Sequence, residues 1–116
     1  MKVKTEDLEG EALDWAVAQC EMRREDYRES GLLVHRIGAQ EPMPAYSSDW
    51  AFGGPVIDRE QISLFAPELP LTETWRAGWG PVWAFGPSAL IAAMRVYVRS
   101  KLGDEVDIPD QRLSLT

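Results

Sequence analysis

The sequence has few of the residue types on which metal sites and nucleophilic catalysis depend. Its 116 residues include a single cysteine, Cys20, and a single histidine, His35. A lone cysteine cannot close an internal disulfide, and no Cys/His spacing typical of a zinc site is present. A catalytic histidine also needs a nucleophile or carboxylate held beside it, and the sequence identifies none for His35. The sequence therefore assigns no metal ligand, no cofactor and no catalytic residue.

Long apolar stretches are also lacking. The longest one, near residues 90–94, is far too short to span a bilayer. The first four residues, MKVK, do not have the apolar segment of a signal peptide. We therefore expect a cytoplasmic protein without membrane contact.

Positive charge is scarce as well. The chain carries 12 basic and 19 acidic residues, which gives a net charge of −7. Only residues 88–102 are locally positive, with Arg95, Arg99 and Lys101 and no acidic residue. Because nucleic-acid phosphates repel an acidic protein, direct DNA or RNA binding is disfavoured. Such binding would need Arg76, Arg95 and Arg99 to form one surface patch.

The overall composition is that of an ordinary globular domain. Apolar residues make up 45% of the chain and charged residues 27%, and the length is close to that of a typical single domain. There is no internal repeat and no linker. We predict one α+β domain over residues 1–116, with residues 109–116 as a frayed tail. Five tryptophans in a chain of this length are unusual and need an explanation.

Apolar periodicity predicts a first helix from about residue 11 to residue 24. Its core face consists of residues at helical spacing, namely Ala12, Leu13, Ala16, Val17 and Cys20. Trp15, Ala18 and Met22 form a second apolar strip on nearly the opposite side. A helix buried on one face does not need that strip, so we expect a loop or another chain to cover it.

A second helix is expected to begin after residue 46. Ser48 is the predicted N-cap, with Asp49 in an acidic first turn. The Gly53–Gly54 pair interrupts this helix, which is predicted to restart with Pro55 at a first helical position and to run to about Glu60.

The last helix is the clearest, with Pro87 at its first position and Gly103 just past its end. Its predicted core face consists of Leu90, Ile91, Met94, Tyr97, Val98 and Leu102. Arg95 and Arg99, one turn apart, are expected at the edge of this face toward water. The preceding residues 78–86, rich in glycine, proline and aromatic residues, are predicted to form a loop.

Strands are expected in short stretches of alternating or β-branched residues. They are predicted at residues 2–4, 32–34, 61–65, 72–77 and 105–108. The short connection between 61–65 and 72–77 suits an antiparallel pair. The expected architecture is an α+β sandwich in which a small, mostly antiparallel sheet packs against two or three helices.

Three blocks of the sequence together resemble a known family. They are KVKTEDLEGEALDWAVAQCE within residues 1–21, YSSDWAFGGPVIDREQISL at 46–64 and GPSALIAAMRVYVRSKLGDEVDIP at 86–109. They resemble the NinX-like family of small tailed-phage proteins, and the order of the blocks is similar to a wider group of phage α/β sandwich domains. The resemblance implies a phage-encoded accessory protein acting in the bacterial cytoplasm. It implies no mechanism and no catalytic residue.

One candidate site surrounds the predicted start of the second helix. Tyr46, Ser48, Asp49, Trp50 and Arg59 could form a polar pocket with an aromatic wall, able to hold a small anion or a partner's side chain. The alternative, which we favour, is a capped helix in which these residues serve only the local structure.

A second candidate site is the cluster of Trp75, Trp79 and Trp83, with Phe85 beside it. Tryptophan is enriched at the centres of protein interfaces, and an exposed cluster would mark a binding surface. The alternative is that these rings cover a small core. A single strand face cannot hold all three tryptophans, and we expect Trp75 to pack and Trp79 and Trp83 to make contacts.

Three functions remain open. The first is a non-enzymatic module that binds a host or phage protein, with a homo-oligomer and an acidic nucleic-acid mimic as variants. The second is a small ligand-binding or enzymatic domain with its pocket at residues 46–50. Direct nucleic-acid binding comes third because of the charge balance. We favour the first function, because no triad, metal set or cofactor motif is visible.

Overall fold

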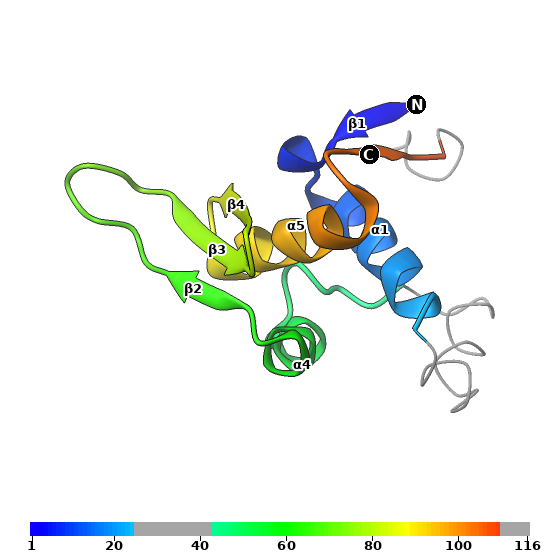
Figure 1. The fold of residues 1–116 in the computed structure, drawn as a ribbon, viewed down its shortest axis with the longest axis horizontal. Helices are drawn as coiled ribbons and strands as arrows, with labels where there is room; N and C mark the ends of the chain where they lie inside the picture. Colours follow the sequence, from blue (N-terminus) through cyan, green and yellow to red (C-terminus); the bar gives the residue numbers. More distant parts are fainter. Residues whose placement is uncertain (25–42, 110–116) are drawn as a thin grey trace.

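A computed structural model describes residues 1–24 and 43–109 (Figure 1). The elements are β1 (Lys2–Lys4), the single-turn helix η1 (Thr5–Asp7), α1 (Gly10–Met22), α4 (Trp50–Glu60), β2 (Ser63–Phe65), β3 (Trp75–Trp79), β4 (Val82–Gly86), α5 (Ala89–Leu102) and β5 (Glu105–Asp107). Three helices and small antiparallel sheets confirm the predicted α+β class. The predicted strand at 32–34 and His35 lie outside the described residues.

Helix α5 is the centre of the fold. It packs against the sheet of β2, β3 and β4 on one side and against α1 and α4 on the others (Figure 1). Its length follows from its ends, because Ser88 Oγ accepts a hydrogen bond from the Ile91 amide at 3.1 Å and Gly103 adopts φ +91°. The prediction that Pro87 is the first helical residue is wrong, since Ser88 is the N-cap and the helix begins at Ala89.

The prediction of a loop at residues 78–86 is also wrong. Strands β3 and β4 form a hairpin that pairs Trp79 with Val82 across a two-residue turn. Gly80 supplies the positive φ, +54°, that such a tight turn needs. Small and large residues alternate at 83–86, and this period of two is the signal of a strand. The strand predicted at 72–77 consequently lies later, at Trp75–Trp79.

Two predictions for α4 need correction. Asp49, and not Ser48, is the N-cap, because its Oδ1 accepts from the Ala51 amide at 2.9 Å, and no acidic residue follows in the first turn. The helix also continues through Pro55 without a restart. Pro55 is the sixth residue of α4, beyond the first turn, so its missing N–H removes one i→i−4 hydrogen bond, which the helix tolerates. Gly53 allows close packing, since a Cβ there would come within 2.6 Å of the Leu90 side chain.

Helix α1 buries most of its predicted core face. Leu13, Ala16, Val17 and Cys20 are buried, and burial raises the pKa of the Cys20 thiol to about 12. Within the described residues the second apolar strip is covered in part, because Ala18 is fully buried, whereas Trp15 and Met22 are half-buried.

The first and last strands of the described residues form a second sheet. Strands β1 and β5 pair antiparallel, with Val3 opposite Val106. Both strands lie beside the C-terminal end of α5, away from the larger sheet (Figure 1). The larger sheet therefore has no contribution from the ends of the described chain, and its strand order is β2-β3-β4.

Candidate functional site

The two faces of the β2-β3-β4 sheet differ in burial. The register places Leu64, Ala77 and Ala84 side by side on the inner face, which packs against α5. Ala77 and Ala84 are buried there. Because side chains alternate along a strand, the neighbouring residues point to the opposite, outer face. The outer face carries Ser63, Phe65, Arg76, Gly78, Trp83 and Phe85.

Three aromatic rings are exposed on this outer face. Phe65 is 39% exposed, Trp83 is 42% exposed and Phe85 is 55% exposed. The ring centroids of Phe65 and Trp83 are 5.6 Å apart, so the two rings are in contact. The Trp83 ring lies over Gly78, where a Cβ atom would come within 2.9 Å of it. Glycine at this position thus leaves the space into which the indole packs; we call this contact the seat of the indole.

Arg76 lies between the rings of this face. Its guanidinium carbon is 4.5 Å from the Phe65 ring centroid and 4.8 Å from the Trp83 centroid. Phe85 is its cross-strand partner on β4. We call Phe65, Arg76, Trp83 and Phe85 the aromatic face. It combines large apolar surface with one positive charge, a combination enriched at protein interfaces.

The free edge of β4 beside the aromatic face is closed by two arginines of α5. Arg95 donates to the Phe85 carbonyl at 2.9 Å, and Arg99 donates to the Trp83 carbonyl at 2.6 Å. Arg95 and Arg99 are four residues apart on the helix, a rise of about 6 Å, and Trp83 and Phe85 are two residues apart on the strand, a rise of about 6.7 Å. The two arginines are therefore spaced like the two carbonyls that they bind. The prediction that Arg95 points to water is wrong, because it is buried and also donates to the Leu8 carbonyl at 2.8 Å. A strand cannot add at this edge without displacing both arginines.

The residues at 46–50 do not form a polar pocket. Tyr46 is buried, the Ser47 amide donates to buried Asp14 at 2.8 Å, and Asp49 is exposed and caps its own helix. Trp50 is 55% exposed and lines a groove of about 620 Å³ together with Trp75. The other lining residues are uncharged, namely Ser47, Ser48, Leu64, Ser88, Ala89, Leu90 and Ile91. The groove therefore presents apolar surface and hydroxyls but no titratable group for acid or base catalysis.

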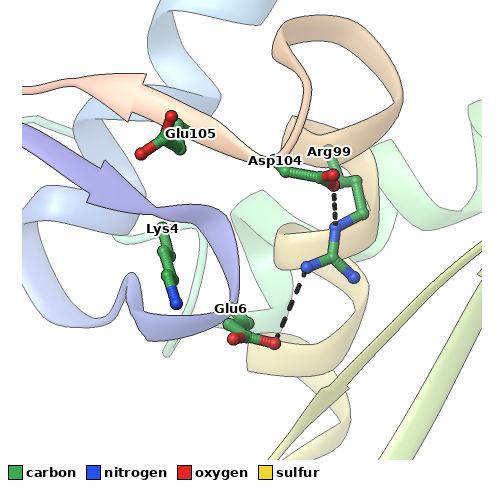
Figure 2. A pocket seen from close by; sticks show the side chains of 5 residues that line it. All are labelled: Lys4, Glu6, Arg99, Asp104 and Glu105. Carbon is green, nitrogen blue, oxygen red and sulfur yellow. Dashed lines mark ion pairs between the residues drawn. The ribbon is translucent and has the colours of Figure 1, made fainter.

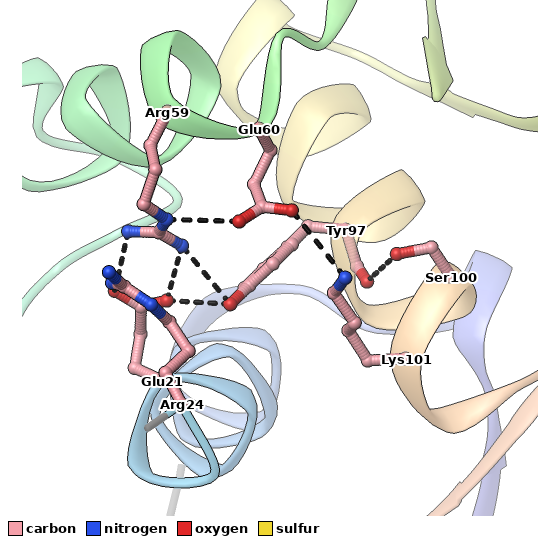
Figure 3. Close-up of polar contacts among 7 residues, drawn as sticks. All are labelled: Glu21, Arg24, Arg59, Glu60, Tyr97, Ser100 and Lys101. Atoms are coloured by element: carbon pink, nitrogen blue, oxygen red, sulfur yellow. Dashed lines mark hydrogen bonds and ion pairs between the residues drawn. The ribbon is translucent and has the colours of Figure 1, made fainter. Parts of the chain in front are cut away.

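Arg59, also a candidate, lies in a different part of the molecule. It binds both carboxylate oxygens of Glu21, at 3.2 Å and 2.7 Å, and donates to the Tyr97 hydroxyl at 3.2 Å (Figure 3). Tyr97 in turn donates to Glu21 at 2.6 Å, and its burial and this hydrogen bond raise the pKa of its hydroxyl. Lys101 reaches the same network through Glu60 at 3.5 Å. The network ties α1, α4 and α5 together and accounts for Arg59 without a ligand.

A pocket of about 500 Å³ lies between the small sheet and the end of α5 (Figure 2). Arg99 pairs there with Asp104 at 3.1 Å and with Glu6 at 3.9 Å. Lys4 and Glu105 complete the lining. The charges of opposite sign lie within this one pocket, so it presents no concentrated field to a charged ligand.

Of the three clustered tryptophans, only Trp83 belongs to the aromatic face. Trp75 and Trp79 are half-buried on the inner face and pack against the core, and the Lys101 ammonium lies 4.8 Å from the Trp79 ring. Sequence reasoning did not single out Phe65 and Arg76 as part of this surface. A hairpin at 75–86 would have revealed them, because strand alternation then places them on the same face as Trp83.

The fold and this site define a small α+β domain with an uncovered aromatic sheet face. Among residues 1–24 and 43–109, no group of three or more His, Cys, Asp or Glu residues could hold a metal ion. In the same ranges no helix has the length and apolar character needed to cross a bilayer. Over residues 4–101 the chain matches the family described as Bacteriophage P22, NinX, and it belongs to that family. No curated protein matches the chain. The family membership confirms the resemblance to NinX-like phage proteins.

Proposed function

We propose that this phage protein is a non-enzymatic module that binds another protein, of the host or of the phage, in the bacterial cytoplasm. The aromatic face carries the proposal. Phe65, Trp83 and Phe85 leave much of their apolar surface in contact with water. Removing such surface from water contributes about 25 cal/mol per Å² buried, so a complementary partner gains free energy by covering it.

A protein partner fits this face better than a nucleic acid does. Aromatic rings on a sheet with a nearby arginine can also stack bases. However, nucleic-acid binding also needs a positively charged path for the phosphates, and the chain has a net charge of −7. Arg95 and Arg99, which would have to extend such a path, are engaged by the carbonyls of β4.

Affinity capture from phage-infected cells with matched variants tests the proposal. The test variant is Trp83→Ser/Phe85→Ser, and the control is Trp50→Ser, which removes a more exposed indole from another surface. We expect the wild type and the control to retain the same proteins and the double variant to lose them. Retention of those proteins by a folded double variant would argue against the aromatic face.

The groove between Trp50 and Trp75 supports a second candidate function. Its volume of about 620 Å³ is within the range of small-molecule sites, and its lining is largely apolar. In this alternative the chain binds a small apolar ligand. Titration with an environment-sensitive apolar dye is a direct test, because the dye should bind the wild type and fail to bind Trp50→Ser.

A further inference from the structure

Arg76 differs from Arg59, Arg95 and Arg99, the other arginines described by the structure after residue 43. Arg59 is bound by Glu21 and Glu60, and Arg95 and Arg99 donate to backbone carbonyls. Arg76 instead lies against the Phe65 and Trp83 rings in two cation–π contacts. No acceptor within the described residues takes a hydrogen bond from its guanidinium. An exposed cation is therefore positioned by two rings, with its N–H donors available.

This arrangement is suited to binding a carboxylate. A guanidinium presents its donors in a rigid fork that matches the two oxygens of Asp or Glu. Its contacts with Phe65 and Trp83 restrict the side chain before any partner arrives, so less conformational entropy is lost on binding. The rings around it leave room for apolar groups on either side of the carboxylate.

We infer that the aromatic face binds a protein segment in which one acidic residue is flanked by apolar residues. The carboxylate pairs with Arg76, and the apolar side chains cover Phe65, Trp83 and Phe85. This inference rests on the proposed function and specifies the chemistry of the partner. The observation that carries the inference is charge complementarity. An acidic protein exposes, among the rings of the aromatic face, one cation that has no acidic partner in the described residues.

The surroundings of the aromatic face disfavour a nucleic acid, which is the other kind of ligand that could use the same rings and guanidinium. A groove of about 580 Å³ next to Phe85 is lined by the acidic residues Glu6, Asp7 and Glu73 and by Arg95 and Arg99. The three carboxylates outnumber the two guanidinium groups, which are engaged by carbonyls of β4, so the groove offers an extended phosphate backbone no net attraction. A single carboxylate held at Arg76 carries less charge past this groove. The face is therefore selective for an isolated acidic side chain.

Selection from a displayed library of short random peptides, with the full-length chain as bait, tests the inference. The baits are the wild type, Arg76→Gln, Arg76→Glu and Trp83→Ser. We expect wild-type peptides to carry one Asp or Glu between apolar residues, and Arg76→Glu to select Lys or Arg at that position instead. For a synthesised wild-type peptide, Arg76→Gln should weaken the affinity roughly ten- to a hundredfold, as loss of a hydrogen-bonded charge pair does.

The outcomes separate this inference from the proposed function. Peptides that require Trp83 but carry no acidic residue would leave the protein-binding function in place and overturn the role of Arg76. Selection that yields no Trp83-dependent peptide would overturn both. Binding of a single-stranded oligothymidine probe that depends on Arg76 and Trp83 would replace the protein partner by a nucleic acid. Thermal unfolding of each bait shows that it is folded before it is compared.

Discussion

The inner and outer faces of the β2-β3-β4 sheet are made by the same three strands and yet differ in burial. Ala77 and Ala84 on the inner face are buried under α5, whereas Trp83 and Phe85 on the outer face are exposed. The smallest apolar side chains are thus buried and two of the largest are exposed. This is the reverse of the usual preference for burying large apolar side chains. Helix α5 packs closely on the inner face and needs small residues there, whereas no described residue covers the outer face and limits the size of its side chains.

The difference shows that residue size by itself does not identify a core. Inner-face alanines let α5 approach the sheet closely, and bulkier residues there would separate the two layers. Outer-face rings contribute little to folding, since folding leaves much of their surface in water. A surface that folding does not require, in which a cation is positioned among aromatic rings, supports the proposed binding function. The following variants test that contrast.

The largest effect is expected from Met94→Ala on α5. Met94 is fully buried, so the truncation removes core contacts and leaves a cavity. We expect the free energy of unfolding to fall by about 2–5 kcal/mol, measured by urea denaturation. Met94→Leu, which nearly conserves volume, should cost less than about 1.5 kcal/mol. Equal losses for both variants would contradict close packing around α5.

Arg95→Met tests the closed edge of β4. The variant keeps much of the apolar stem but leaves the Leu8 and Phe85 carbonyls without their donor. Burial of this guanidinium lowers its pKa, which reflects the cost of placing the charge there. We expect a loss of about 1–3 kcal/mol in the free energy of unfolding, because carbonyls that lose their partner remain partly desolvated. Stability unchanged from the wild type would mean that the edge needs no cap.

Gly78→Ala tests the seat of the indole. The new Cβ meets the Trp83 ring at 2.9 Å, and the exposed ring can move aside at a cost of about 1 kcal/mol. We also expect weaker binding of peptides selected on the wild type, measured by fluorescence polarisation. In the Gly78→Ala/Trp83→Ala double variant the stability cost should be smaller than the sum of the single costs. Strict additivity would show that the two residues do not interact.

The smallest stability effect is expected from Phe85→Ser on the outer face. Its ring is largely exposed, so the free energy of unfolding should change by no more than about 0.5 kcal/mol. The same variant should lose a large part of its affinity for selected peptides. A stability loss comparable with that of Met94→Ala would show that Phe85 belongs to the core and would remove the contrast between the faces.

The sequence predicted the helices better than the hairpin. The faces of α1 and α5 follow from apolar spacing over several turns, and both were placed to within two residues at each end. The sequence does not predict the hairpin, because glycine and proline at 78–81 also signal a loop. Ser48 and Asp49 are adjacent and have similar propensities for the N-cap position, so the sequence does not decide between them.

The candidate sites were predicted only in part. The excess of tryptophan pointed to an exposed aromatic surface, and Trp83 belongs to one. Trp75 and Trp79 are four residues apart on one strand and therefore share the inner face. Trp79 pairs with Val82, so the next residue, Trp83, points to the outer face. Arg59 is close to residues 46–50 in the sequence and was predicted to share their pocket. In the structure its charge is paired with Glu21 on α1.

The amino-acid sequence by itself determined the class of the fold, the apolar faces of the main helices, the acidic charge and the family of phage proteins. The first three are properties of composition and of short periodic patterns, which local physics fixes before distant segments meet. The family follows from the resemblance of three sequence blocks and the match over residues 4–101. Only the tertiary structure decided which aromatic rings remain exposed and that Arg76 lies between two of them without a hydrogen-bond acceptor among the described residues. Burial and ion pairing depend on neighbours distant in sequence, such as α5 over the sheet and Glu21 beside Arg59.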